Sequence, residues 1–104
     1  MKRLGLATAV LLCGCSSEAN SYVVETEQAV SPVTSAMVSV CRQRAWALER
    51  SGTRFAGTRS ANCEGSGFVR LTHQDGTTTD CPVGYVTVGA GQSFTYVVTG
   101  RACD

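Results

Sequence analysis

Six cysteines are the residues of this chain best suited to covalent chemistry. Two of them, Cys13 and Cys15, lie near the N-terminus. The other four are spread through the rest of the chain at intervals of 22, 18 and 22 residues: Cys41, Cys63, Cys81 and Cys103. Zinc sites built from four thiolates normally use closely spaced pairs such as Cys-x-x-Cys, and these intervals contain none. The spacing therefore favours two disulfides over a zinc site, and disulfides indicate an oxidising compartment.

Turn residues indicate which cysteines pair. Four cysteines allow three pairings, and loop entropy does not choose among them, because each closed loop is worth about 3 to 4 kcal/mol. Ser51-Gly52 lies midway between the first two cysteines, and Gly89-Ala90-Gly91-Gln92 lies midway between the last two. Glycine supplies the positive φ that tight turns require, so each pair would close the open end of a long hairpin. We therefore predict the disulfides Cys41–Cys63 and Cys81–Cys103.

The N-terminal segment has the parts of an export signal. Lys2 and Arg3 precede a run of apolar or small residues, 4 to 12, which is too short for a membrane-spanning helix of roughly twenty residues. The next residues, Leu12-Cys13-Gly14-Cys15, resemble the lipobox of bacterial lipoproteins. In that family the pattern is Leu, a small residue, Gly or Ala, and the Cys that takes lipid. Cys13 stands where Ala or Ser is more usual.

The lipobox resemblance implies a location. Members of the family are cleaved before the lipidated Cys, here Cys15, and carry acyl chains on its sulfur and amino group, which together give lasting membrane attachment. Ser16, rather than Asp, follows it, which in the family implies the outer membrane, on its periplasmic or cell-surface side. An alternative is an ordinary secretory signal peptide cut after Ser17-Glu18-Ala19. Both alternatives export the chain.

Composition divides the chain into three parts. Residues 1–14 are the predicted signal peptide, 15–35 the predicted lipidated N-terminus and tether, and 36–104 the predicted domain. The tether assignment follows from a segment rich in Ser, Glu and Thr that contains Pro32 and no basic residue. Tyr22-Val23-Val24 could instead add an edge strand.

Residues 68 onward carry β patterns. Segments 68–72, 77–79, 85–88 and 94–99 are β-rich, and Asp75-Gly76 is a hairpin turn signal. Phe94, Tyr96 and Val98 share one face of the last segment and are the predicted core stripe. We predict a mainly β fold, a small disulfide-stapled antiparallel sheet or sandwich of hairpins.

Residues 36–50 fit two structures. Met37 to Cys41 read as a strand, but Met37, Cys41, Ala45 and Leu48 would also form one helical stripe with Gly52 as a C-cap. The pattern slightly favours a strand at 37–42 and leaves 43–50 open. A helix here would make the fold α+β.

Charge and residue types exclude several functions. Without residues 1–14 the chain has seven basic residues, all arginine, and eight acidic ones, which argues against nucleic-acid binding. The single His73 lies beside the Asp75-Gly76 turn, where a solvated loop residue is expected, and no nucleophile pairs with it. Asp75 and Asp80 fit turn geometry. We therefore expect a non-enzyme that requires no cofactor or metal.

One cluster has the residue types of a binding surface. Arginine forks recognise carboxylates and phosphates, and Trp and Arg are enriched at interface hot spots. The residues concerned are Arg42, Arg44, Trp46, Arg50, Arg54 and Arg59. The alternative is that these arginines form a solvated face that keeps the domain soluble.

Two functional classes fit these observations. The first is a membrane-anchored accessory or structural lipoprotein that contributes a small binding module to an envelope assembly, with an envelope protein as partner and no indicated oligomeric state. The second is a periplasmic or surface inhibitor. Ser51-Gly52-Thr53-Arg54-Phe55 resembles the Ser-Gly-x-Arg-Tyr loop of membrane-bound lysozyme inhibitors, with Phe for Tyr. That resemblance implies inhibitory contacts by Ser51 and Arg54.

Overall fold

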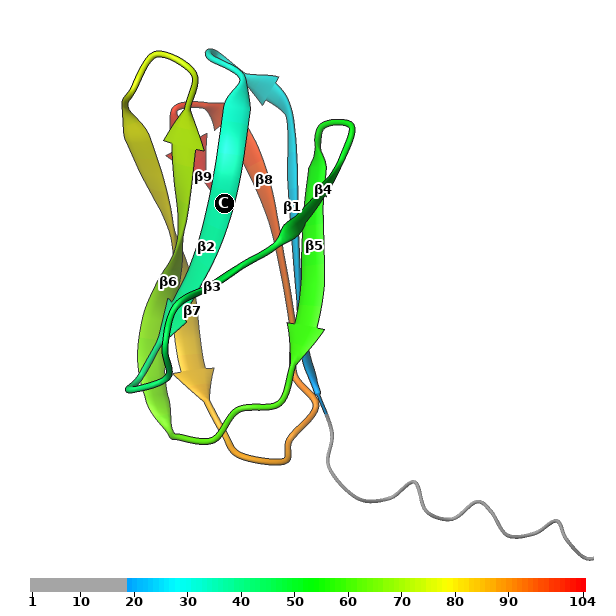
Figure 1. The fold of residues 1–104 in the computed structure, drawn as a ribbon, viewed down its shortest axis with the longest axis vertical. Coiled ribbons are helices and arrows are strands. Elements are labelled where there is room, and N and C mark those ends of the chain that lie inside the picture. Colours follow the sequence, from blue (N-terminus) through cyan, green and yellow to red (C-terminus); the bar gives the residue numbers. More distant parts are fainter. Residues whose placement is uncertain (1–18) are drawn as a thin grey trace, which may run out of the picture.

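The computed structural model describes residues 19–104, and within that range every regular element is a β-strand. One sheet has the strand order β4-β5-β1-β8-β9 and the other has the order β3-β2-β6-β7. Figure 1 shows the two sheets face to face as a sandwich. The strands are β1 (Asn20–Ala29), β2 (Val33–Val40), β3 (Trp46–Ala47), β4 (Glu49–Ser51), β5 (Arg54–Arg59), β6 (Gly65–His73), β7 (Thr78–Val86), β8 (Ser93–Gly100) and β9 (Ala102–Cys103). The predicted mainly β fold is confirmed.

The two ends of the sandwich differ in the connections that they carry (Figure 1). We call one end the base: it holds the connections 41–45, 60–64 and 87–92, beside the first residue of β1. We call the other end the tip: it holds the connections 30–32, 52–53 and 74–77, with Arg101 between β8 and β9.

Alternating burial explains why residues 33–40 form a strand. Ala36, Val38 and Val40 point into the core, whereas Met37 between them is exposed. This period of two is that of a strand with one buried face. The helical alternative for 36–50 is wrong, because Met37 and Leu48 would share a helical stripe but only Leu48 is buried. Residues 41–45 form a connection instead, and the chain continues into β3 and β4.

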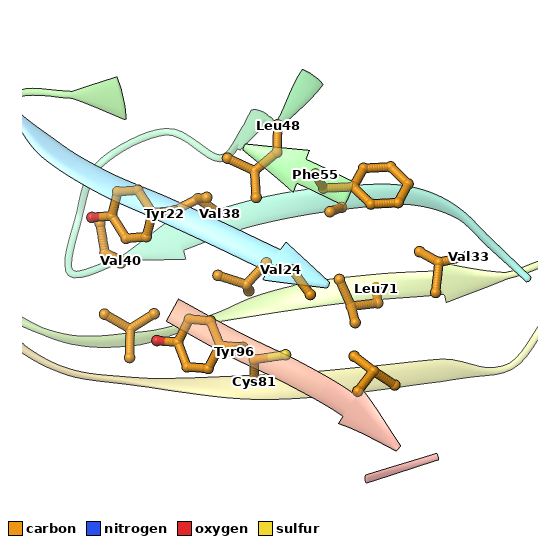
Figure 2. Packing of buried hydrophobic residues seen from close by; sticks show 14 of the residues in the cluster. Tyr22, Val24, Val33, Val38, Val40, Leu48, Phe55, Leu71, Cys81 and Tyr96 are labelled. Atoms are coloured by element: carbon orange, nitrogen blue, oxygen red, sulfur yellow. The ribbon is translucent and has the colours of Figure 1, made fainter. Parts of the chain in front are cut away.

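The core lies between the sheets and draws on both of them. Figure 2 shows Val24 and Tyr96 from the five-stranded sheet opposite Leu71 and Cys81 from the four-stranded sheet. Burial of each large side chain of this kind stabilises the fold by about 1.5 to 3 kcal/mol. The Tyr96 hydroxyl donates a hydrogen bond to the Pro82 carbonyl across the sandwich at 2.8 Å. Burial raises the pKa of Tyr96 to about 12, so this donor keeps its proton at neutral pH.

Two β features predicted from sequence are confirmed. β6 and β7 form the hairpin whose turn contains Asp75-Gly76, with Gly76 at φ 90°. In β8, Tyr96 and Val98 are buried and Phe94 is half-buried on the same face. These residues form the predicted core stripe.

The predicted tether is wrong from Asn20 onward. Residues 20–29 form β1, which lies in the middle of the five-stranded sheet, antiparallel to β5 and parallel to β8. Tyr22, Val24 and Thr26 are buried on its inner face, and the residues between them, Val23 and Glu25, are half-buried. Pro32 belongs to the turn between β1 and β2. The predicted signal peptide and the predicted lipidation site, Cys15, lie outside the described residues.

Both predicted disulfides are present, but only one of the two predicted hairpins is. Cys41–Cys63 joins two connections at the base, and Cys81–Cys103 joins β7 to β9 across the sheets. Gly52, at φ 65°, turns the β4–β5 hairpin as expected. Residues 87–92 instead connect strands of different sheets, because a loop of this length bridges the roughly 10 Å between packed sheets.

Removing each disulfide separately would measure what the cross-sheet bond contributes. Both bonds close loops of the same sequence separation, 22 residues, so each should contribute about 3 kcal/mol through chain entropy. Cys81 is fully buried, whereas Cys41 and Cys63 are half-buried. We therefore expect C81A/C103A to lower the free energy of unfolding, measured in urea, by about 1 kcal/mol more than C41A/C63A. Equal losses would contradict a core role for Cys81.

Candidate binding surface

The structure separates the six predicted binding residues into two groups. Arg42 and Arg44 lie in the connection between β2 and β3, and Trp46 and Arg59 lie beside it. These four residues are at or next to the base. The remaining two, Arg50 and Arg54, lie on the β4–β5 hairpin near the tip. The six residues therefore do not form one continuous surface, because the chain reverses direction at Gly52.

Trp46 is held in place by three contacts. Its ring packs on Gly57, where an added Cβ would lie only 2.9 Å from Trp46 Cζ3. The Tyr22 ring meets it edge-on, with centroids 5.7 Å apart, and the Arg59 guanidinium lies 4.6 Å from its centroid. The last distance is typical of a cation–π interaction. Trp46 therefore bridges the two sheets and also supports Arg59 at the surface.

The aromatic cluster continues into the sandwich with residues that the sequence analysis did not assign to a site. Tyr22 stacks on Phe94 with centroids 5.2 Å apart and an interplanar angle of 15°. Tyr22 was missed because it fell in the predicted tether. The signal that could have identified it is the alternation of Tyr22, Val24 and Thr26, which is the pattern of a strand.

A shallow hollow lies beside this cluster, at the point where the chain passes from one sheet to the other. The residues that line it are Trp46, Ala47, Glu49, Ala56, Gly57, Thr58 and Arg59. Glu49 contributes a carboxylate and Arg59 a guanidinium, so the hollow has mixed charge. It offers polar contacts at the edge of β5, but no side chain arranged for proton transfer or nucleophilic attack.

A second hollow lies at the tip, between the β1–β2 turn and the β4–β5 hairpin. Its lining residues are Thr26, Glu27, Ala29, Val30, Pro32, Val33, Arg50, Gly52 and Thr53. Val30 is 62 % exposed, the largest exposed fraction among the large apolar residues described as exposed. Arg50 Nε donates to the Gly52 carbonyl at 3.0 Å, and Arg54 Nε lies 3.4 Å from Glu25 Oε2. The hollow therefore combines an exposed apolar side chain with one arginine, Arg50, that a backbone carbonyl orients, and such a combination is typical of a protein-binding site.

The environment of His73 differs from the predicted one. His73 was expected to be a solvated loop residue, but it is 1 % exposed. Its Nδ1 lies 2.9 Å from the Ser31 carbonyl oxygen and its Nε2 lies 2.7 Å from Thr79 Oγ1. Both ring nitrogens thus have structural partners, because the strand places His73 on the inner face of β6. It ties the β1–β2 turn to the neighbouring strand β7.

The two aspartates have structural roles near the tip. Asp75 Oδ1 accepts hydrogen bonds from the Thr77 amide and hydroxyl, and its Oδ2 accepts one from Arg101 at 2.8 Å. The bonds from Arg101 and Thr77 hold the pKa of Asp75 well below its usual range. Asp80 pairs with Arg70 through two hydrogen bonds, and these bonds likewise lower its pKa. These aspartates are ionised partners of arginine.

Two further findings concern residues 19–104. No three His, Cys, Asp or Glu side chains in this range come together as metal ligands would. No membrane-crossing helix occurs in this range either.

Compared with known proteins, the chain matches no family model, and it has no significant match among curated proteins or solved structures. Its own residues and geometry are therefore the basis on which a function can be proposed.

Proposed function

We propose that this protein is a lipid-anchored accessory protein of a bacterial envelope, attached through Cys15, whose β-sandwich is a binding module for an envelope protein. The supporting observation is the way in which the cysteines pair. The four that follow Cys15 are joined to one another in two disulfides. Once residues 1–14 are removed, Cys15 is the one cysteine left with a free sulfur for lipid. The disulfides also fit export to an oxidising compartment.

The position of the anchor supports the same proposal. Only residues 16–19 separate Cys15 from the first strand of the sandwich. A domain attached this closely stays at the membrane surface, where it can contribute contacts to an assembly but cannot range far from it. Ser16 after the lipidated Cys directs such a protein to the outer membrane by the family's sorting rule.

The tip hollow is the surface that we assign to the partner. Its lining residues lie toward the end of the sandwich opposite the start of β1, so an anchored molecule would present this hollow away from the anchor. Val30 would supply apolar area, and Arg50 would supply a cation already oriented by the Gly52 carbonyl. Such a site favours a partner with an apolar side chain next to a carboxylate.

Substitution at the two N-terminal cysteines tests the anchor. We expect C15S to abolish incorporation of an alkyne-tagged fatty acid and to remove the protein from the washed membrane fraction. C13S is the matched control, because Ser is usual at that place of the lipobox, and it should remain acylated and membrane-bound. Mass spectrometry of the mature N-terminus would give acylated Cys15.

Two results would contradict the anchor. One is fatty-acid label retained in C15S. The other is a mature chain that begins at Asn20 with a free amino group, which is the product of an ordinary secretory signal peptide.

An inhibitory function is the second candidate, and one observation favours it. Ser51 and Arg54 lie on either side of the turn of a hairpin, and both are exposed and therefore accessible to another protein. Phe55, which stands where the lysozyme inhibitors have Tyr, is buried in the core and anchors the hairpin. Arg54 is already paired with Glu25, and both side chains remain about half exposed.

A lysozyme assay separates the two candidates. If the hairpin is inhibitory, the protein should inhibit a lysozyme, and S51A/R54A should abolish the inhibition while R42A/R44A leaves it intact. If the protein is the accessory component proposed above, neither the wild type nor the variants should inhibit. Lack of inhibition when the protein is in large molar excess over the lysozyme would rule out the inhibitory function.

A further inference from the structure

Charge is distributed unevenly between the base and the rest of the sandwich. Among the charged residues of 19–104, the base carries three arginines, Arg42, Arg44 and Arg59, against one carboxylate, Glu64. The remaining surface carries four arginines against six carboxylates. A domain that is neutral as a whole is therefore positive at the base and negative elsewhere. Such an arrangement orients the molecule toward an anionic surface.

Arg42, Arg44 and Arg59 have no carboxylate partner in the part of the chain that the structure describes, a property that they share with Arg50 near the tip. The three ion pairs among residues 19–104 join Arg54 to Glu25, Arg70 to Asp80 and Arg101 to Asp75. Arg42, Arg44 and Arg59 are all exposed. They can therefore approach an external anion without first breaking an ion pair within the domain.

Interfacial side chains accompany these arginines. Tyr85, close to the end of β7, is 60 % exposed, and Val88, in the connection 87–92, is 51 % exposed. Tyr is favoured at the level of lipid headgroups, where its ring contacts apolar groups and its hydroxyl contacts water, and Val88 adds exposed apolar area at the same end.

The point at which the N-terminal segment joins the sandwich is fixed at the base. Asn20, the first residue of β1, is buried, and its Oδ1 accepts a hydrogen bond from the Gln92 amide at 2.7 Å. The Ser21 amide donates to the Gln92 carbonyl at 2.9 Å. The Gln92 side chain in turn bonds the Thr87 amide and the Tyr85 carbonyl. The start of β1 is thus held against the connection 87–92 by side chain and backbone.

The length of the segment from Cys15 to Asn20 limits how an anchored domain can be oriented relative to the bilayer. From Cys15 to Asn20 a fully extended chain spans at most about 18 Å. The ten residues of β1 span about 33 Å from base to tip. A membrane contact through the tip would place Asn20 farther from the bilayer than the chain from Cys15 can reach.

From these observations we infer that the base is a membrane-docking face, on which Arg42, Arg44 and Arg59 contact anionic lipid headgroups of the bilayer that holds the anchor. The inference rests on lipidation of Cys15 as proposed above. It deepens that proposal, because it divides the surface in two: the base binds lipid, and the tip is presented to a partner.

Fluorescence of Trp46, the single tryptophan of the chain, can test this inference, because Trp46 lies next to the base. The chain beginning at Cys15 is coupled through that sulfur to a maleimide lipid in vesicles that also contain a headgroup spin label. We expect quenching in vesicles with 30 % phosphatidylglycerol to exceed that in purely zwitterionic vesicles, and 0.5 M salt to reduce the excess. R42Q/R44Q should weaken docking about 25-fold, about fivefold for each charge, and remove the excess quenching.

The matched control is R50Q/R54Q, which removes the same charge from the tip and should leave the quenching unchanged. Equal Trp46 quenching in anionic and zwitterionic vesicles would contradict the proposal that the base docks on lipid. An equal loss of quenching in R42Q/R44Q and R50Q/R54Q would also contradict it. Chemical coupling installs the anchor whether or not cells acylate Cys15. Failure of acylation is seen separately in the fatty-acid labelling of C15S and C13S, so the two proposals fail independently.

Discussion

The position of β1 between β5 and β8 is the constraint on which the rest of the structure depends. Without this strand the five-stranded sheet would separate into two pairs, β4 with β5 and β8 with β9. β1 also contributes Tyr22 and Val24 to the core, and Tyr22 contacts both Trp46 and Phe94. The start of β1 therefore belongs to a strand that is buried on one face and hydrogen-bonded on both edges. Two-stranded fragments have little stability of their own.

This constraint also determines how the domain can be displayed. Because β1 begins at the base, a lipid on Cys15 would be attached by residues 16–19 rather than by a long tether. An accessory protein attached in this way would have one end close to lipid and the other facing outward. The surface chemistry of the two ends fits that division: the base carries arginines without carboxylate partners in the described chain, and the tip carries an exposed Val30 beside the oriented Arg50. The parallel pairing of β1 with β8 and the cross-sheet bond Cys81–Cys103 keep the two ends in a fixed relation.

Sequence patterns predicted two kinds of feature: local ones, and the disulfides, which follow from the number and spacing of the cysteines. The β6–β7 hairpin follows from Asp75-Gly76, the inner face of β8 from its alternation, and both disulfides from cysteine spacing and turn residues. The features that failed depend on pairing across the chain. Residues 20–29 resemble a tether because polar residues are frequent among them. Only the pairing of β1 with β5 and β8 shows that these residues form a strand with one buried face. The arginines of residues 42–59 are close in sequence, but the chain crosses between sheets and reverses at Gly52, which places them at opposite ends. His73 is adjacent to a turn in sequence, but β6 continues far enough to bury it.

Hydrogen exchange of the β1 amides is the measurement that tests the central claim most directly. If β1 is the middle strand, its bonded amides between Tyr22 and Thr26 should exchange only through global unfolding, as slowly as the amides of β6 around Val69. Exchange of the residue 22–26 amides within seconds, with β6 still protected, would show that these residues are a tether. The account of a short anchor segment and a fixed base would then be wrong.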